Sequence, residues 1–320
     1  MTDTTPRPHV AVLAGGVSLE REVSLRSGAR VADALEDRGY PVVRLDVDSS
    51  LVRHLAEGDF DVAFIALHGG AGEDGTIQSI LELLELPYTG PDTLASALAW
   101  DKPIAKGLYR RVGIATPEQV SLSAQAFRDM GVAAAIDRIA DELGLPLVVK
   151  PATGGSSLGL THLERPQELP AAVVHALSYA DAVLIEQHIT GVEVAVSVLD
   201  GTPLPAVEIR PKQGAYDFAA RYTAGATEFH VPARLDADVL ERCAQVAVAA
   251  YDAIGARHVS RADLIVDLDG VPWLLELDTC PGLTETSLLP LAARAAGMDL
   301  GDLAERLVTL ALSGGWPEGT

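Results

Sequence analysis

The feature that most constrains the fold is the segment 257–290, RHVSRADLIVDLDGVPWLLELDTCPGLTETSLLP. Two apolar runs flank Asp269-Gly270, a pair typical of the two-residue turn of a β-hairpin. A turn at this pair sets the register of the hairpin and places Asp263 directly opposite Glu276. The sequence therefore predicts two antiparallel strands with two carboxylates facing each other across them.

The same register places a second pair of ionisable residues beside the first. Arg261 falls opposite Asp278, and residues two apart on a strand share a face, so all four side chains are predicted on one face. Opposed carboxylates repel each other and destabilise a hairpin. A divalent cation would reverse that effect, because Mg²⁺ binds carboxylates together with phosphate oxygens. The alternative is a water-exposed face on which acidic and apolar residues simply alternate.

Charge and cysteine content argue against several classes of function. The 320-residue chain has a net charge of −21, which argues against a nucleic-acid backbone or an anionic membrane surface as partner. No apolar run approaches the length of a membrane span, and no secretory pattern opens the chain. Cys243 and Cys280 match no metal-ligand spacing and suggest a reducing compartment. We therefore expect a cytoplasmic protein of two or three domains.

Strand and helix patterns alternate near the start of the chain, which predicts a parallel sheet. Strands are predicted at 9–14, 41–45 and 61–67, and helices at 18–38 and 76–86. Ligands gather at the carboxyl ends of such strands, where Glu20 and the glycine-rich run from His68 to Gly75 are found. Glu20 could instead be a carboxylate favoured by the helix dipole, and His68 an ordinary histidine at a strand end.

A second unit follows the boundary candidate PYTGP at 87–91. We expect a helix at 94–109, a strand at 118–122, a helix at 124–143 and a strand at 145–150. Lys150 ends this strand and enters PATGGSSLG, a loop whose hydroxyls and free amides suit phosphate oxygens. A plain β-hairpin loop is the alternative.

The remaining patterns lead to the hairpin. Helices are predicted at 166–179 and 236–254, strands at 182–187, 193–199 and 204–209, and helices after 290 that pack on the hairpin sheet. Glu186 and Glu193 stand at strand ends, where a carboxylate could bind ribose hydroxyls or simply be solvated. The polar stretch 210–228 is predicted to be a loop over a site.

Taken in this order, the predicted elements and motifs resemble the D-alanine–D-alanine ligase family of the ATP-grasp superfamily over about residues 9–313. The matching motifs are GGVSLEREVSLRSG (15–28), LHGGAGEDGTIQ (67–78), PYTGPDTLASALAWDK (87–102), VVKPATGGSSLG (148–159), YDFAARYTAGATEF (216–229) and RADLIVDLDGVPWLLELDTCPGLTETSLLP (261–290). The resemblance implies an α/β chain with an ATP-grasp fold, α+β in its ATP-binding part, after an N-terminal parallel-sheet domain. It also implies domains at 1–92, 93–187 and 188–320.

The resemblance implies a role for each site residue. ATP would be bound through its phosphates, its adenine and its ribose by Lys102, Lys150, Gly155, Ser156, Ser157, Glu186, Ile189, Glu193 and Arg221. The metal ligands would be Asp263, Glu276 and Asp278. The catalytic set would be Glu20, Ser156, Tyr222 and Arg261, and the amino-acid substrates would also meet His68, Gly282, Ser287 and Leu288.

The implied reaction has two steps. The carboxylate of one D-alanine takes the γ-phosphoryl group of ATP, and the amine of a second D-alanine attacks the acyl phosphate, giving a dipeptide for peptidoglycan precursors. Two Mg²⁺ or Mn²⁺ ions, K⁺ activation and a homodimer are also implied. The alternatives are a related ligase using D-serine or a specialised amine, and a catalytically silent ATP-binding homologue.

Three positions depart from the family pattern. The family usually has Asn where Asp278 stands, often Lys where Arg221 stands, and often His where Arg21 stands. Arg21 is expected to alter how the neighbouring Glu20 holds an ammonium group. Tyr222 follows the dipeptide-forming pattern, and a neutral phenol there argues for an amine as the second nucleophile.

Overall fold

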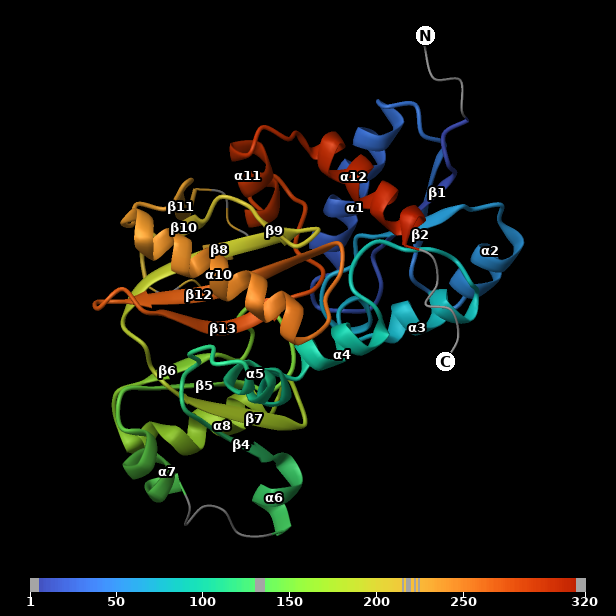
Figure 1. Ribbon diagram of the computed structural model, residues 1–320. Helices are drawn as coiled ribbons and strands as arrows, with labels where there is room; N and C mark the ends of the chain where they lie inside the picture. The colour runs from blue at the N-terminus through green and yellow to red at the C-terminus, as the bar shows by residue number, and fades with distance from the viewer. Residues whose placement is uncertain are drawn as a thin grey trace.

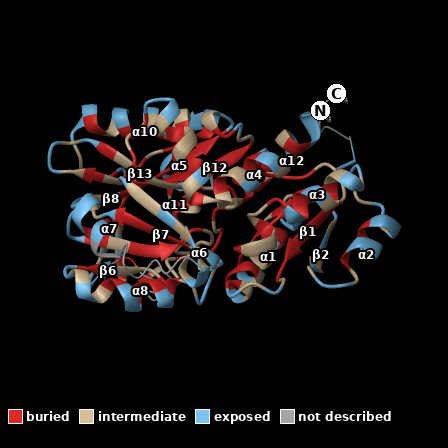
Figure 2. Cartoon of the chain, turned by 90° about the horizontal axis from the view of Figure 1, so that it is seen from below, coloured by how far each residue is buried: buried red, intermediate tan, exposed pale blue. Residues whose placement is uncertain are grey.

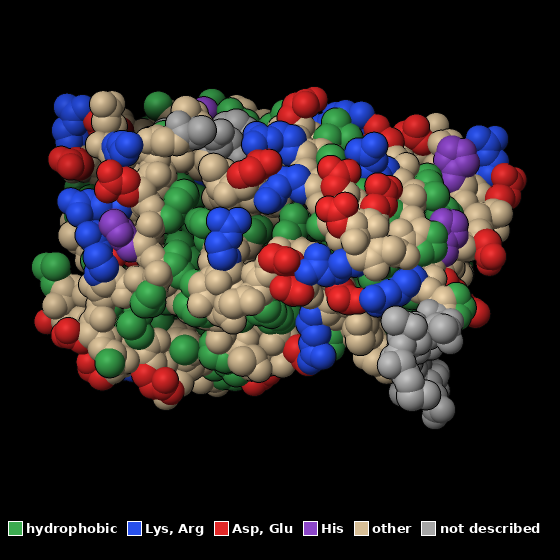
Figure 3. Space-filling model, turned by 90° about the horizontal axis from the view of Figure 1, so that it is seen from above, with side chains coloured by type: hydrophobic (Ala, Val, Ile, Leu, Met, Phe, Trp, Pro, Cys, Tyr) green, Lys and Arg blue, Asp and Glu red, His purple; other side chains and the backbone are tan. Residues whose placement is uncertain are grey.

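A computed structural model describes residues 6–129, 136–214, 216, 220–221, 223 and 225–314. Within these ranges the chain builds three sheets one after another (Figure 1). Figure 2 shows the strands buried beneath helices whose outer faces are exposed. On the face in Figure 3, basic side chains lie among acidic ones, with hydrophobic side chains visible between them. No described helix has the length and apolar character that crossing a bilayer requires.

The N-terminal sheet is parallel, as the alternating pattern predicts. Its strand order is β2 (Val42–Asp46), β1 (Val10–Ala14), β3 (Val62–Ile65). The helices of this domain are α1 (Arg21–Glu36), α2 (Leu51–Glu57) and α3 (Thr76–Leu83), and the 3-10 turn η1 (Gly70–Gly72) precedes α3. All five residues of β1 are buried, which accounts for its unbroken apolar run.

The second sheet has four antiparallel strands. Their order is β4 (Gln119–Ser123), β7 (Ala182–Gln187), β5 (Leu147–Pro151), β6 (Thr161–Leu163). The helices of this layer are α6 (Ala124–Asp129), α7 (Ile136–Leu143) and α8 (Leu169–Ala176), with the 3-10 turn η3 (Pro166–Glu168) before α8. Because β5 and β6 are antiparallel neighbours, the loop after Lys150 is the connection of a β-hairpin.

The third sheet contains the carboxylate hairpin. Its order is β11 (Thr227–His230), β10 (Val207–Pro211), β8 (Gly191–Leu199), β12 (Val259–Asp267), β13 (Pro272–Asp278), and β9 (Thr202–Pro203) pairs with β8. The helix α10 (Ala237–Ala253) packs on it. The segment predicted as one helix at 94–109 is two helices, α4 (Thr93–Trp100) and α5 (Lys102–Arg111). Asp101 separates them, because its carboxylate accepts the N–H of Ile104 and caps α5.

The hairpin turn corrects one prediction and confirms another. The connection is a three-residue loop, since the Asp267 N–H donates to the Val271 carbonyl, and its glycine, Gly270, has a φ of 76°. A β-bulge after Asp263 then moves the register by one residue. The two shifts cancel, so Asp263 lies opposite Glu276 and Arg261 opposite Asp278, as predicted.

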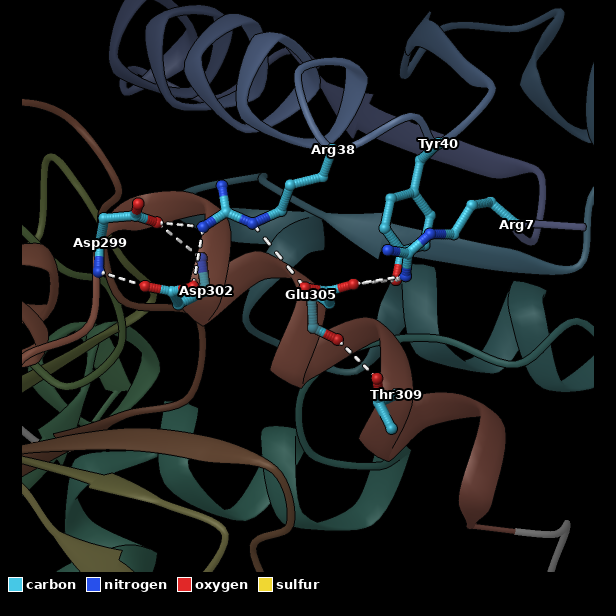
Figure 4. A network of polar contacts seen from close by, with 7 residues as sticks. All are labelled: Arg7, Arg38, Tyr40, Asp299, Asp302, Glu305 and Thr309. Atoms are coloured by element: carbon cyan, nitrogen blue, oxygen red, sulfur yellow. Dashed lines mark hydrogen bonds and ion pairs between the residues drawn. The ribbon is translucent and has the colours of Figure 1, made fainter. Parts of the chain in front are cut away.

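The prediction that both C-terminal helices pack on the hairpin sheet is wrong for the last one. The helix α11 (Leu288–Ala295) contacts β8, but α12 (Leu300–Ser313) returns to the N-terminal domain and packs on α1. Polar contacts fix α12 there (Figure 4). Arg38 lies 2.6 Å from Asp299 and 2.8 Å from Asp302, and Arg7 lies 2.5 Å from Glu305. The last segment of the chain therefore joins the hairpin domain to the first sheet.

Candidate active site

Two cavities meet between the domains. The larger, of about 760 Å³, lies between the four-stranded sheet and the hairpin sheet. The smaller, of about 80 Å³, extends from the larger toward the N-terminal domain and α11. Every predicted site residue that the structure describes lines one or both cavities; Tyr222 lies outside the described residues. Both cavities share the side chains of Lys102, Tyr216, Arg221 and Glu276.

The larger cavity has both apolar walls and ionisable groups in its lining. Val148, Ile209 and Ile265 give it apolar walls, and its volume lies in the range of small-molecule sites. Glu193 lies in its lining, where burial raises the pKa of the carboxyl to about 7. Such a group can accept or donate hydrogen bonds to hydroxyls at neutral pH.

Three lysines lie close together, Lys102 and Lys150 in the lining of the larger cavity and Lys106 buried behind it. The Lys102 Nζ atom lies 3.3 Å from Glu276 Oε2 and donates to the Gly154 carbonyl. The Lys150 Nζ atom lies 2.6 Å from Glu186 Oε2, and Lys106 contacts the other oxygen of Glu186. Sequence reasoning missed Lys106, although its spacing of four residues from Lys102 places both on one helix face.

The carboxylates of the hairpin are paired with cations. Arg261 donates to both oxygens of Asp263, at 2.6 and 2.8 Å, and lies 2.9 Å from Asp278. Burial raises the pKa of Asp278, although the positive charge of Arg261 acts to lower it. Burial also favours neutral Glu276, but nearby cations, Lys102 first, lower its pKa to about 2. Among the described residues, no group of three or more Asp, Glu, His or Cys side chains is arranged as a metal cluster.

A second acidic group faces the smaller cavity. Ser156 donates a hydrogen bond to Glu20, which is buried, and Ser156 has a φ of 57°. Glu73 also lines this cavity and accepts the Gly69 N–H at 2.7 Å. Burial, together with Asp278 and Glu20, raises the pKa of Glu73 well above its ordinary value. Sequence reasoning missed Glu73, a carboxylate inside the glycine-rich loop that could have been flagged there.

His68 and Arg21 are tied to the protein. The His68 Nε2 atom lies 2.8 Å from Ser27 Oγ, and burial lowers the pKa of His68 to about 4, so the ring is neutral at pH 7. Arg21 lies 2.5 Å from Asp46 and donates to the Gly16 carbonyl. The guanidinium of Arg21 is therefore held by Asp46 at the end of β2, and its effect on how Glu20 binds an ammonium group stays a prediction.

The end of the smaller cavity is built from a turn and the start of α11. A Cβ atom at Gly282 would lie 2.7 Å from the Ser287 hydroxyl, so the backbone approaches Ser287 closely here. The Ser287 Oγ atom lies 2.8 Å from Thr284 Oγ1, and Leu288 opens α11. Gly282, Ser287 and Leu288 line this end of the cavity.

The three-sheet fold, with lysines and carboxylates at the junction of two cavities, defines a ligase of the ATP-grasp type. The family model described as "D-ala D-ala ligase C-terminus" matches residues 108–309, and "D-ala D-ala ligase N-terminus" matches residues 51–91. The D-alanine--D-alanine ligase of Pelotomaculum thermopropionicum is 43% identical over 95% of this chain and 96% of its own. The chain belongs to the D-alanine–D-alanine ligase family.

Solved structures agree with this assignment. The D-alanine--D-alanine ligase from Bacillus anthracis complexed with ATP matches with a TM-score of 0.81 and 33% identity, over 95% of this chain and 97% of that one. The VanG D-Ala:D-Ser ligase from Enterococcus faecalis matches with a TM-score of 0.82 and 29% identity, over 95% of this chain and 99% of that one. The two scores are nearly equal, so the overall fold does not distinguish the second substrate.

Proposed function

We propose that this chain uses ATP to join two D-alanines through a D-alanyl phosphate. The observation that carries the proposal is the junction of the two cavities at Lys102, Arg221 and Glu276. A nucleotide in the larger cavity would direct its phosphates toward this junction, and amino acids in the smaller one would meet them there. Phosphoryl transfer requires mainly alignment and charge neutralisation, which these cations supply.

The amino-acid side of the reaction uses the smaller cavity. Glu20, held by Ser156, would bind the ammonium group of the first D-alanine and so direct its carboxylate to the junction. That carboxylate attacks the γ-phosphorus, and ADP leaves. The amine of the second D-alanine then attacks the acyl carbon, loses a proton, and displaces phosphate. Arg261 and the Gly282 N–H would stabilise the oxyanion, while Ser287 and Leu288 would line the second pocket.

The nucleotide side uses the larger cavity. Lys102, Lys150 and Arg221 would contact phosphates, beneath the loop containing Gly155, Ser156 and Ser157. Glu193 would bind the ribose hydroxyls, and Ile189 and Glu186 would lie near the adenine. Tyr222 would complete the catalytic set.

The carboxylates of the hairpin fit a hard divalent cation. They supply only oxygen donors, and Asp263 and Glu276 are directly opposed in the register. Mg²⁺ or Mn²⁺ held by these residues and Asp278 would take over the charge that Lys102 and Arg261 now balance, and would neutralise the phosphates. We further propose two such ions, K⁺ activation, a cytoplasmic location and a homodimer without nucleic-acid or membrane partners. Light scattering in solution tests the dimer.

Phosphate release from ATP and Mg²⁺ with single amino acids and pairs tests the function, with products identified by mass spectrometry. D-alanine alone should release phosphate and give D-alanyl-D-alanine. Release only after addition of D-serine or another amine would refute D-alanine as second substrate. ATP binding without phosphate release for any substrate would refute ligase activity and indicate a silent homologue.

A further inference from the structure

We propose that Lys106 is a positioning residue that keeps Lys150 available for nucleotide phosphates by neutralising Glu186. The inference rests on the proposed use of ATP. Lys106 is fully buried and lines neither cavity, so it acts through its neighbours. Its side chain comes from α5, and those of Glu186 and Lys150 come from β7 and β5.

The register of the second sheet brings Lys150 to Glu186. Glu186 pairs with Val148, and Lys150 lies two positions further along β5 on the same face. Diagonal neighbours on a sheet are within reach of long side chains, and the Lys150 Nζ atom lies 2.6 Å from Glu186 Oε2. A buried carboxylate with only this partner would hold Lys150 as its own counter-ion.

Lys106 changes that balance. It contacts Glu186 Oε1, the oxygen that Lys150 leaves free, so each oxygen has its own ammonium group. The Lys106 and Glu186 side chains are 0% and 3% exposed, so water screens the contact little. Glu186 lines the larger cavity, whereas Lys106 does not. Lys106 therefore neutralises the Glu186 carboxylate from the side that faces away from the cavity.

A count of the charges that these ion pairs join shows what Lys106 contributes. Lys102, Lys106 and Lys150 face Glu186 and Glu276, which leaves one positive charge in excess. Without Lys106 the positive and negative charges are equal in number, and Lys150 is the only one of these lysines still paired with Glu186. An anionic triphosphate would then compete with Glu186 for Lys150, because attraction between buried charges is strong.

The substitution Lys106→Met tests this inference by removing the charge while keeping the length of the side chain. Calorimetry with ATP and Mg²⁺ and steady-state kinetics should show Kd and KM for ATP about 10- to 100-fold higher, the range for one lost charge-assisted contact. The KM for D-alanine should stay within about twofold, because Lys106 does not reach the smaller cavity. Lys106→Arg, which keeps the charge, should retain most of the affinity, and Arg242→Met, on an exposed arginine of α10, should leave it unchanged.

A double-mutant cycle with Glu186→Gln separates positioning from packing. Adding Lys106→Met to Glu186→Gln should change ATP affinity less than about threefold, since the charge that Lys106 neutralises is gone. An equal loss in both backgrounds, or an unchanged ATP affinity in Lys106→Met, would overturn the inference. If Lys106→Met alone does not fold, the comparison of Glu186→Gln with the double variant still decides it. Wild-type protein that binds ATP but forms no dipeptide would refute the proposed function alone.

Discussion

Replacement of Arg261 by Met should destabilise the protein strongly as well as inactivate it. The guanidinium makes two contacts to Asp263, at 2.6 and 2.8 Å, and one to Asp278, at 2.9 Å. All three side chains are largely buried, at 9%, 7% and 17% exposure. Removing one partner of a buried ion pair leaves uncompensated charge and costs about 3–5 kcal/mol. We therefore expect the free energy of unfolding to fall by about that amount.

Urea unfolding followed by circular dichroism measures this loss, and Arg242→Met provides the matched control. Arg242 pairs with Asp238 at 2.8 Å on α10, but these side chains are 44% and 71% exposed, so the loss should be below about 1 kcal/mol. Adding Asp278→Asn to Arg261→Met should recover part of the stability, because one unpaired charge disappears. Arg261→Met with stability within about 1 kcal/mol of the wild type would refute the reasoning.

Catalysis provides a second readout of the same substitution. If Arg261 stabilises the oxyanion, kcat should fall by about 10²–10³-fold in the fraction that remains folded. Normal turnover by folded Arg261→Met would remove Arg261 from the proposed mechanism.

Three further predictions each concern a single residue. Asp278→Asn should retain ligase activity, because it restores the residue usual in the family; a folded but inactive variant would show that the site has diverged. Gly69→Ala places a Cβ atom 2.1 Å from Glu20 Oε2 at a φ of +66°, so the KM for D-alanine should rise; Gly39→Ala, with a φ of +81° and no atom within 4 Å, should leave that KM unchanged. His68 has a pKa lowered to about 4, so the unfolded state binds more protons below pH 6.5. The stability of the wild type relative to His68→Gln should thus fall by about 3 kcal/mol between pH 6.5 and 4 in urea titrations, since the other titrating groups act equally in both proteins.

The sequence predicts the register of the hairpin correctly from an incorrect turn. The assumption of a two-residue turn ignores the bulge after Asp263, and both errors shift the pairing by one residue. The bulge has no clear signature in an apolar run, since it is a feature of how β12 pairs with β13. The pairs near the site are right because the two shifts cancel.

Other features carried signals that pattern reasoning passed over. Asp101 followed by Pro103 marks the start of a helix, so the break between α4 and α5 could have been predicted. Lys106 could have been noted from its helical spacing to Lys102, but its partner Glu186 lies 80 residues away in the chain. The contact of Arg21 with Asp46 likewise depends on the order of strands in the sheet. The resemblance supplied the remaining site residues, since separate short motifs cannot show that they meet at one junction.

The path of an oxygen atom tests the central claim most directly. D-Alanine labelled with ¹⁸O in its carboxylate is incubated with the wild-type protein, ATP and Mg²⁺, and the released phosphate is analysed by mass spectrometry. Attack of the carboxylate on the γ-phosphorus, followed by attack of the amine on the acyl carbon, predicts one ¹⁸O atom in each phosphate. Dipeptide formation with unlabelled phosphate would contradict a D-alanyl phosphate intermediate.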